Sequence, residues 1–469
     1  MGNFKLKGKD LKRIKYKSNR AKSLAIDIIN KHYKHVTKQE ILDLLIDVSY
    51  NPENYVDDVH LSPIATEFMP DEIDLSPKQE IALKREEGEL NVFGRQHISS
   101  NAYQQMELAM RLPITEKGAL MPDAHAGYGL PIGGVLATKG AVIPYGVGLD
   151  IGCRMSLSIY DLNQDFLNRY SYQIKCALKE RTCFGTGGEL GIAQEHDVLD
   201  REEFNATELL RRLHGKAARQ LGTSGSGNHF VEFGKVKVTG NTGLDLPEGD
   251  YVGILAHSGS RGLGATVAQH YTDIAKSTCL LPRQAGNLAW LDMESEAGQE
   301  YWMSMNLAGE YAKACHDQIH YHLAKYMGIK PIGKIENHHN FAWKETQEDG
   351  AELIVHRKGA TPAHEGQLGI IPGSMTATGY IVKGTGEGRS LNSAAHGAGR
   401  KLSRTKAKSS ITRSAMNKYL KSNQVTLIGG NPDEAPMAYK NIEDVMSSQK
   451  SLVQVVGEFQ PSIVRMDKS

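Results

Sequence analysis

The chain has 469 residues, and its basic and acidic side chains nearly balance, for a formal net charge of +1 at pH 7. A near-neutral chain is not a polycation, so binding to nucleic acid has to come from local basic patches. The five cysteines include no C-x-x-C pair, which indicates a reducing compartment rather than a disulfide framework. The N-terminus has no apolar signal segment, and no apolar run is long enough to span a bilayer. We therefore expect a cytoplasmic protein with no membrane partner.

Residues 1–85 are predicted to form a basic helical N-terminal extension with a connector. Residues 2–22 hold nine lysines and arginines against one aspartate, which is typical of a solvated arm; contact with RNA phosphates is the second interpretation. Apolar residues from Leu24 to Leu45 recur at helical spacing and predict a small helical appendage. Residues 52–85 alternate proline, acidic and apolar residues, which favours a connector.

From about residue 86 onward the chain is predicted to form a single large mixed domain. Glycines become frequent between short apolar runs, which indicates strands joined by tight loops. Helices are expected over residues 161–180, 199–220, 297–326, 399–420 and 440–456, and strands over 251–257 and 380–382. There is no internal repeat and no regular alternation of strand and helix. The expected class for residues 86–469 is therefore α+β, with central β-sheets flanked by helices.

Five residues of metal-binding type lie next to glycines or at the expected ends of strands: Asp150, Cys153, His229, His257 and His339. Thiolate, imidazole and carboxylate together suit Mn, Zn, Fe or Co. Five such ligands are enough for two ions if the sulfur bridges them. Each residue alone is more often simply packed in a core, and sequence spacing does not establish that they converge.

His396 lies at a junction from small residues to the glycines Gly397 and Gly399, and a basic run begins at Arg400. Glycine allows backbone N–H groups to approach an anion, and cations behind it stabilise phosphate charge. A histidine nucleophile that attacks phosphorus needs this environment. The simpler interpretation is a glycine-rich turn followed by a solvated basic helix.

Other candidate groups are weaker. Asp123 and His125 can do acid–base work or brace a turn. The cationic run 356–358 is a candidate for phosphate contact. His316 and His320 are one helical turn apart, and we interpret them as part of a solvated helix face rather than a metal site.

Common nucleotide and esterase motifs are missing. No Gly-Lys pair is followed by Ser or Thr, which excludes a P-loop. A lysine-x-Asp-Gly motif for nucleotidyl transfer and a G-x-S-x-G elbow are also absent.

Eight segments in order resemble the RtcB family of RNA ligases, over roughly residues 90–469. Eight ordered matches are far more specific than one. The segments are Met121–Gly129, Asp150–Cys153, Gly225–Glu232, His257–Gly262, His339-Asn340, His356–Thr361, Pro372–Met375 and His396–Arg400.

The resemblance implies a GTP- and Mn²⁺-dependent ligase that joins a 2′,3′-cyclic-phosphate or 3′-phosphate RNA end to a 5′-hydroxyl end. Cys153 would bridge two Mn²⁺ ions, with Asp150 and His229 completing one site and His257 and His339 the other. His396 would be the nucleophile that takes GMP from GTP. The residues implied at the nucleotide are Asn228, His229, Phe230, Val231, Glu232, His339, Asn340, Pro372, Gly373, Ser374, Met375, His396, Gly397, Ala398, Gly399 and Tyr439.

Two rival functions remain open at this point. The first is a dinuclear-metal phosphoesterase that acts on RNA ends without GTP, and the second is a non-catalytic RNA-binding relative. The family resemblance also implies RNA as the partner, an archease-like helper and a role in tRNA splicing or RNA repair, and we expect a monomer. The chain departs from the family at Gly379, where serine is common, and at Lys468, which is out of register with the usual C-terminal lysine.

Overall fold

The computed structural model describes residues 5–14, 16, 19–69, 80–86, 88–240, 243, 246–347 and 350–468. The chain forms two compact units, residues 1–79 and residues 80–469. The described part of the first unit is helical, and the second unit combines helices with two large sheets. The predicted α+β class with a helical N-terminal appendage is confirmed. Among the described residues, every helix is too short or too polar to serve as a membrane span.

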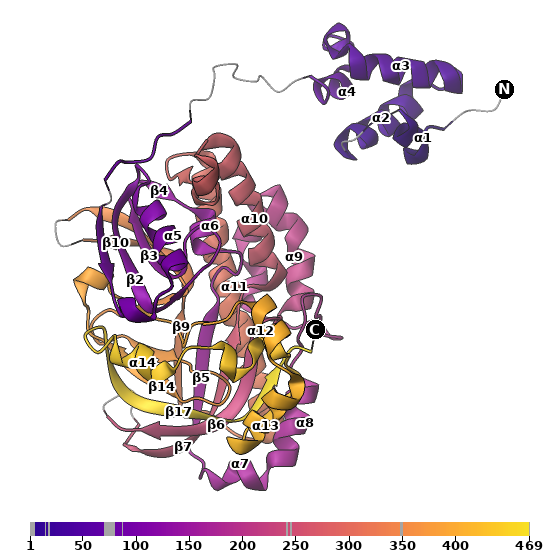
Figure 1. Ribbon diagram of the computed structural model, residues 1–469. Coiled ribbons are helices and arrows are strands. Elements are labelled where there is room, and N and C mark those ends of the chain that lie inside the picture. The colour runs from indigo at the N-terminus through magenta and orange to yellow at the C-terminus, as the bar shows by residue number, and fades with distance from the viewer. Residues whose placement is uncertain are drawn as a thin grey trace. The chain divides into compact units, whose positions relative to one another are not determined.

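The first unit is a small helical bundle around an apolar core. Its elements are α1 (Gly8–Arg13), α2 (Asn19–His32), α3 (Lys38–Tyr50), η1 (Pro52–Tyr55) and α4 (Ser62–Thr66) (Figure 1). Leu6, Leu11 and Tyr16 are buried in this core, so the prediction of a solvated arm is wrong for the described residues. Leu61 and Ile64, from the predicted connector, are buried there as well. Apolar side chains between the charged ones therefore anchor both segments.

The first large sheet of the second unit has five strands in the order β1-β2-β3-β11-β10. They are β1 (Glu89–Val92), β2 (Thr115–His125), β3 (Ile132–Thr138), β11 (Glu352–Lys358) and β10 (Asn340–Thr346). All the pairs are antiparallel except β1 with β2. Strands far apart in the chain are therefore hydrogen-bonded neighbours, such as β3 and β11.

The second large sheet has the order β13-β14-β17-β6-β7-β5-β9, with β16 beside β17. Its strands are β13 (Leu368–Ile371), β14 (Gly379–Gly384), β17 (Val453–Met466), β6 (Phe230–Val238), β7 (Gly249–Ser258), β5 (Arg154–Tyr160), β9 (Gly333–His338) and β16 (Thr426–Ile428). Two short pairs complete the set: β4 (Ala141–Val142) with β8 (Leu291–Asp292), and β12 (Ala360–Pro362) with β15 (Ser393–Ala395). Among the described strands of this second sheet, the pairing of β16 with β17 is parallel and the other pairings are antiparallel.

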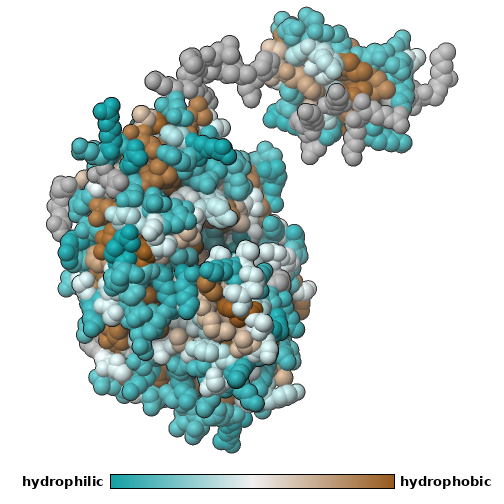
Figure 2. All heavy atoms as spheres, in the orientation of Figure 1, coloured by the Kyte–Doolittle hydropathy of each residue, from teal (hydrophilic) through white to brown (hydrophobic). Residues whose placement is uncertain are grey.

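Helices flank the sheets of the second unit, and hydrophilic side chains cover much of the face shown in Figure 2. The helices are α5 (Ser100–Met110), α6 (Pro144–Val147), α7 (Asp165–Arg169), α8 (Ser171–Arg181), α9 (Glu208–Gln220), α10 (Arg261–Thr278), α11 (Glu296–Met327), α12 (Arg404–Ser410), α13 (Arg413–Ser422) and α14 (Ile442–Ser447). The long helix predicted over 297–326 is confirmed as α11, which starts at the N-cap Ser295 and ends at Gly328, a glycine with positive φ.

Two predicted helices near the C-terminus are wrong in part. Residues 399–420 contain two short helices, α12 and α13, because the side chain of Thr412 caps a second helix directly after the first ends. The helix predicted over 440–456 is confined to α14, and β17 begins at Val453. This strand pairs with both β14 and β6, so pairing with distant strands overrides the local pattern.

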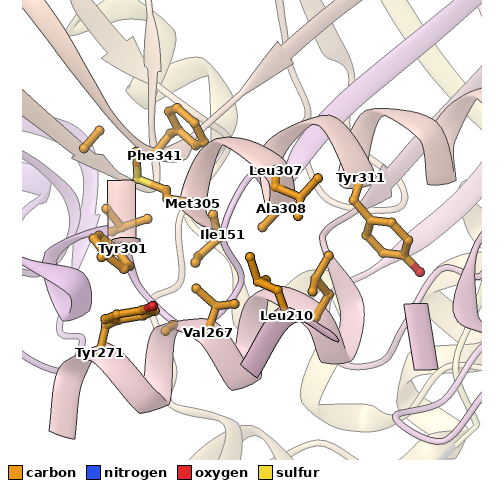
Figure 3. Close-up of a cluster of buried hydrophobic side chains, with 14 of the residues drawn as sticks. Ile151, Leu210, Val267, Tyr271, Tyr301, Met305, Leu307, Ala308, Tyr311 and Phe341 are labelled. Carbon is orange, nitrogen blue, oxygen red and sulfur yellow. The ribbon is translucent and has the colours of Figure 1, made fainter. Parts of the chain in front are cut away.

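The main apolar core lies between α9, α10 and α11 and reaches the loop before β5 (Figure 3). Ile151 is fully buried there, near Val267 of α10 and Ala308 of α11. A Cβ on Gly152 would lie 2.8 Å from the Cα of Gly309, so the loop passes directly against α11. The loop that carries Asp150 and Cys153 is thus held on the core on one side.

Candidate active site

Three of the predicted metal ligands converge through their side-chain atoms, and a fourth, His339, contacts one of them. The Sγ of Cys153 lies 3.1 Å from the Nε2 of His257 and 3.5 Å from the Nε2 of His229. The Nε2 of His257 lies 3.2 Å from the Nε2 of His339. Cys153, His229 and His257 are buried, and their ligand atoms all lie within 4.8 Å of one another. The fifth predicted ligand, Asp150, places Oδ2 2.8 Å from the Nε2 of His229.

Strand register brings these residues together. Met155 of β5 pairs with His257 of β7, and His257 pairs in turn with Phe230 of β6. Arg154 pairs with His338 of β9, which places His339 beside the same end of the sheet. The four segments are separated by up to nearly two hundred residues in the chain. Antiparallel pairing places the relevant ends of their strands at the same end of the sheet.

The hydrogen bonds of the imidazoles leave their Nε2 lone pairs directed at the centre. The Nδ1 of His229 lies 2.6 Å from the carbonyl oxygen of Ser224, and the Nδ1 of His257 lies 3.2 Å from that of Asn228. A carbonyl only accepts, so Nδ1 carries the proton in both rings. The buried Nδ1 of His339 has no hydrogen-bond partner. Converging lone pairs repel one another unless a cation lies between them, so this donor set fits a divalent metal ion.

Burial also determines the protonation of these groups in the absence of a metal. Burial raises the pKa of the Cys153 thiol well above its usual value, and the nearby Asp150 charge adds to the effect. Burial lowers the pKa of His257 to about 3, with a further contribution from His229. A metal ion would therefore meet neutral imidazoles and would displace a proton from the thiol.

His396 lies next to this cluster and is held by Asp123. The Nδ1 of His396 lies 2.7 Å from the Oδ2 of Asp123. The same carboxylate oxygen accepts a hydrogen bond from the backbone N–H of His396 at 3.3 Å. Asp123 is fully buried at the end of β2. The ring centroid of His396 is 4.8 Å from that of His339. The Nε2 of His396 is left as the free nitrogen of the ring.

The glycines after His396 allow this approach. Gly399 has a φ of +68°, and a Cβ there would lie 2.1 Å from the carbonyl oxygen of Asp123. Only glycine accepts both the conformation and the contact. Just before His396, Leu391 and Asn392 adopt positive φ values of 53° and 48°. Residues with positive φ therefore lie on both sides of His396: Leu391 and Asn392 before β15, and Gly399 after it.

Arg357 fixes the turn that precedes His396. Its side chain is fully buried, with Nη1 2.6 Å from an oxygen of Glu345 and Nη2 2.8 Å from the carbonyl oxygen of Leu391. Its Nε donates to the hydroxyl of Ser393 at 2.7 Å. Arg357 was a candidate for phosphate contact, and that interpretation is wrong, because its donors are already engaged inside the protein.

His356 is likewise internal, and Lys358 alone of this run lines the cleft. The Nε2 of His356 accepts from the N–H of Ile143 at 2.9 Å. Lys358 donates from Nζ to the carbonyl oxygens of Tyr128 and Tyr145, and Nζ lies 5.0 Å from the centroid of the Tyr145 ring. Burial lowers the pKa of Lys358 to about 7. An anion in the cleft would restore its charge.

A single cleft of about 1340 Å³ contains the thiol, two of the imidazoles and His396. The predicted nucleotide residues that line it are Asn228, Phe230, Glu232, His339, Asn340, Pro372, Gly373, Ser374, Met375, His396, Gly397, Ala398, Gly399 and Tyr439. His229 and Val231 are the two predicted nucleotide residues that do not line it, and the side chain of Val231 is fully buried in the core beneath β6. The alternation of a strand explains this, because Phe230 and Glu232 face the side opposite Val231.

Two polar features of the cleft were not predicted from the sequence: the protonation state of Glu232, which was itself expected at the nucleotide, and an acidic pair. Burial raises the pKa of Glu232 well above its usual value, so its carboxyl is held in the neutral form. The second feature is an acidic pair at η7 (Pro432–Glu434): Glu434 accepts from Tyr439 and Arg404, and from Arg400 at 3.1 Å. Arg400 and Arg404 are thus partly neutralised, which limits the basic run as an RNA surface.

His316 and His320 are buried in α11, so the solvated helix face expected for them is wrong. The Nδ1 of His316 lies 2.9 Å from the carbonyl oxygen of Ala312, and the Nδ1 of His320 lies 2.8 Å from the Ser158 hydroxyl. Neither histidine is among the residues that line the cleft.

The fold and the cleft together define an enzyme with a metal-type donor set beside a positioned histidine. The RtcB family, described as tRNA-splicing ligase RtcB, matches residues 104–467. The RNA-splicing ligase RtcB of Escherichia coli (strain K12) is 33% identical over 394 residues, which cover 76% of this chain and 92% of that protein. The tRNA-splicing ligase RtcB of Nanoarchaeum equitans is 31% identical over 461 residues, covering 81% and 96%. The chain belongs to the RtcB family of RNA ligases.

Proposed function

We propose that this chain is a GTP- and Mn²⁺-dependent RNA ligase. It joins 2′,3′-cyclic-phosphate or 3′-phosphate RNA ends to 5′-hydroxyl ends through a covalent His396–GMP intermediate, in tRNA splicing or RNA repair. The observation that carries the proposal is His396, held by Asp123 within one cleft beside the cluster of Cys153 and its histidines. Membership of the RtcB family supports the RNA substrate.

The proposed metal ligands are those implied by the family resemblance, and the donor atoms that converge around Cys153 support them. Asp150, Cys153 and His229 would hold one ion, and His257 and His339 would hold the second together with the same sulfur. Mixed sulfur, nitrogen and oxygen donors suit several divalent ions, and family membership favours Mn²⁺. When bound, such cations stabilise the negative charge that develops on phosphate oxygens during attack at phosphorus.

His396 is the nucleophile in the first step. Its Nδ1–H donates to Asp123, so the Nε2 lone pair is available without a base. Nε2 forms a bond to the α-phosphorus of GTP while the bond from that phosphorus to the β-phosphate oxygen breaks, and pyrophosphate leaves. The ring then carries a positive charge, which the Asp123 carboxylate stabilises.

The nucleotide would lie along the part of the cleft lined by Asn228, Phe230, Glu232, Asn340 and the predicted segments 372–375 and 397–399. Phe230 offers an apolar ring edge, and the neutral carboxyl of Glu232 can both donate and accept hydrogen bonds to a base. Lys358 also lines the cleft and is the candidate for contact with an RNA phosphate.

Two further displacements follow: the RNA 3′-phosphate displaces His396 from GMP, and the RNA 5′-hydroxyl then displaces GMP from the RNA. An oxygen of the RNA 3′-phosphate attacks the phosphorus of GMP and breaks the P–N bond, which returns His396 to its neutral form. The 5′-hydroxyl of the second RNA end then attacks the activated 3′-phosphate, a phosphodiester forms, and GMP leaves. A 2′,3′-cyclic phosphate is first opened by water to a 3′-phosphate.

The test is ligation of two defined RNA strands by the full chain. One strand carries a 2′,3′-cyclic phosphate and the other a 5′-hydroxyl, with Mn²⁺ and GTP added or omitted in turn. The proposal predicts a joined product only when both are present. Opening of the cyclic phosphate with Mn²⁺ alone, and no joining under any condition, would instead identify a metal-dependent phosphoesterase.

A further inference from the structure

The N-terminal unit lies outside the region that defines the family. The RtcB match covers residues 104–467, and the first unit ends at residue 79. This unit has its own buried core, which includes Leu11, Ile29 and Leu45. The described residues that line the cleft of the second unit begin at Gln96. The unit is therefore separate from the part of the chain that matches the family.

The N-terminal unit carries most of its basic residues in the first half of its sequence and most of its acidic residues in the second half. Residues 1–38 contain twelve lysines and arginines and two acidic residues, whereas residues 39–69 contain seven acidic residues and no lysine or arginine. Within the unit, α3 lies across from α1 and α2 (Figure 1). Most basic residues of the unit thus belong to α1, α2 and the segments beside them, and the acidic residues belong mainly to α3 and the residues after it.

Two contacts gather lysines from separate segments into one patch. Asn30, near the end of α2, bonds to the backbone of Leu6 in both directions, at 2.9 Å and 3.2 Å, which places the start of the chain beside the end of α2. The Nζ of Lys38, at the start of α3, lies 2.9 Å from Asp10 of α1. We call the resulting group the lysine patch: Lys5, Lys7, Lys9, Lys31, Lys34 and Lys38, all exposed.

The acidic side chains near the lysine patch do not cancel it. Asp10 is buried and bonds to the N–H of Lys7 and to Lys38, and the Lys38 bond lowers its pKa. Glu40 is committed to the cap of α3, where it accepts from the N–H and hydroxyl of Thr37 at 2.9 Å and 2.6 Å. Asp27, one helical turn before Lys31 on α2, is a third, exposed carboxylate. Six lysines thus stand against three carboxylates, and the patch keeps an excess of positive charge.

We propose that the lysine patch docks the phosphate backbone of RNA and so holds the substrate of the ligase on the protein. The inference rests on the proposed function, since RNA is then the polyanion that the second unit handles. Exposed lysines on flexible stems bind phosphates as point charges, without reading sequence. Residues 70–79 join the two units, so RNA held by one is at raised local concentration for the other. The patch thereby lowers the concentration of RNA needed for ligation and leaves the chemistry unchanged.

The test variant replaces Lys5, Lys9, Lys31 and Lys34 together by glutamine in the full chain, and leaves the Lys38–Asp10 pair intact. Affinity for a single-stranded RNA is measured by fluorescence anisotropy from 50 to 300 mM salt, without GTP. Each lost phosphate contact lowers the slope of log affinity against log salt by about 0.7, so the expected decrease is about 2 to 3. Affinity at 100 mM salt falls by about tenfold or more, and the KM for RNA ends rises while kcat is retained.

Matched variants control for folding and for charge in general. Arginine at the same four positions keeps the charge and is expected to restore affinity and slope. Glutamine at four exposed lysines of the second unit that do not line the cleft, Lys139, Lys237, Lys330 and Lys450, is expected to change the slope by less than one. The rate of His396 labelling by GTP, which needs no RNA, is expected to be the same in all variants.

Three outcomes would overturn the inference. The first is an unchanged salt slope in the glutamine variant. The second is loss of affinity in the arginine variant as well, which would indicate a structural role. The third is lysine-dependent binding to vesicles containing phosphatidylserine without any effect on RNA, which would assign the patch to an anionic membrane. Because RNA binding is measured without catalysis, failure of ligation in every variant would count against the proposed function and leave the docking result standing.

Discussion

Asp123 and His396 are 273 residues apart in the chain and share a 2.7 Å contact between Oδ2 and Nδ1. The carboxylate is fully buried, and its second oxygen, Oδ1, has no hydrogen-bond partner. Asp123 is thus committed to the ring and backbone of one residue. The consequence is that His396 presents Nε2 to the cleft in a fixed tautomer.

Replacing Asp123 by asparagine tests this relationship. The amide keeps the size of the side chain but no longer holds the proton on Nδ1 or stabilises the charged ring. Control of the tautomer is worth large factors in other histidine sites, so GTP-dependent labelling of His396 is expected to slow by about 10² to 10⁴. Labelling is followed in single-turnover experiments. The bound Mn²⁺ is expected to stay at the wild-type amount, and its loss would mean that Asp123 supports the metal site instead.

Cys153→Ala is expected to weaken Mn²⁺ binding by more than about 100-fold, because it removes the ligand shared by both proposed ions. Metal content after dialysis is measured by mass spectrometry. Cys315→Ala is the matched control, since this cysteine is equally buried but packs in the core of α11. Wild-type metal content in Cys153→Ala would exclude the thiol as a ligand.

Arg357→Met is expected to destabilise the protein by about 3 to 5 kcal/mol, because it leaves Glu345 without its buried partner and frees the turn at Leu391. Urea unfolding measures the change. The control is Arg389→Met, which breaks the more exposed pair with Glu387 and should cost less than about 1 kcal/mol. Equal effects of the two substitutions would show that the buried network adds nothing beyond a surface pair.

Lys358 predicts a specific dependence of stability on pH. Burial lowers its pKa from 10.5 to about 7 in the folded chain. Between these values the unfolded state binds a proton that the folded state does not, so stability rises with pH and falls as pH decreases toward 7. The free energy of unfolding of the wild type, relative to Lys358→Met, should increase from pH 7.5 to 9.5 by up to about 1.4 kcal/mol per unit. If the free energies of unfolding of the wild type and of Lys358→Met depend on pH in the same way, the Tyr128 and Tyr145 carbonyls keep the Lys358 ammonium charged.

Much of the site was accessible from the sequence because its chemistry resides in short segments. Each motif supplies its own turn, as in the passage from His396 to Gly399, and most of the residues that the motifs predicted line one cleft. Their convergence was not accessible, because it depends on the pairing of β5 with β7 and β9. The contact between His396 and Asp123 could not be predicted for the same reason, because the local sequence explains Asp123 equally well as a turn residue.

The errors share a physical cause, which is that local pattern does not report long-range pairing. Residues 440–456 have helical spacing, but the part that belongs to β17 forms its backbone hydrogen bonds with the distant strands β14 and β6. His316 and His320 are polar residues on a long helix, yet α11 is packed on several sides and buries them. In the basic N-terminal segment, the few apolar residues decide the outcome and the many charges do not.

The most direct test of the His396–GMP intermediate is labelling of the full chain with α-labelled GTP and Mn²⁺, followed by denaturing electrophoresis. The expected result is a covalent adduct that is labile to acid, stable to alkali and absent from His396→Ala. A histidine–phosphorus bond has this stability, whereas a phosphoester on serine would survive the acid. Absence of an adduct with wild-type protein that has bound its metal, or an adduct that persists in His396→Ala, would contradict the central claim.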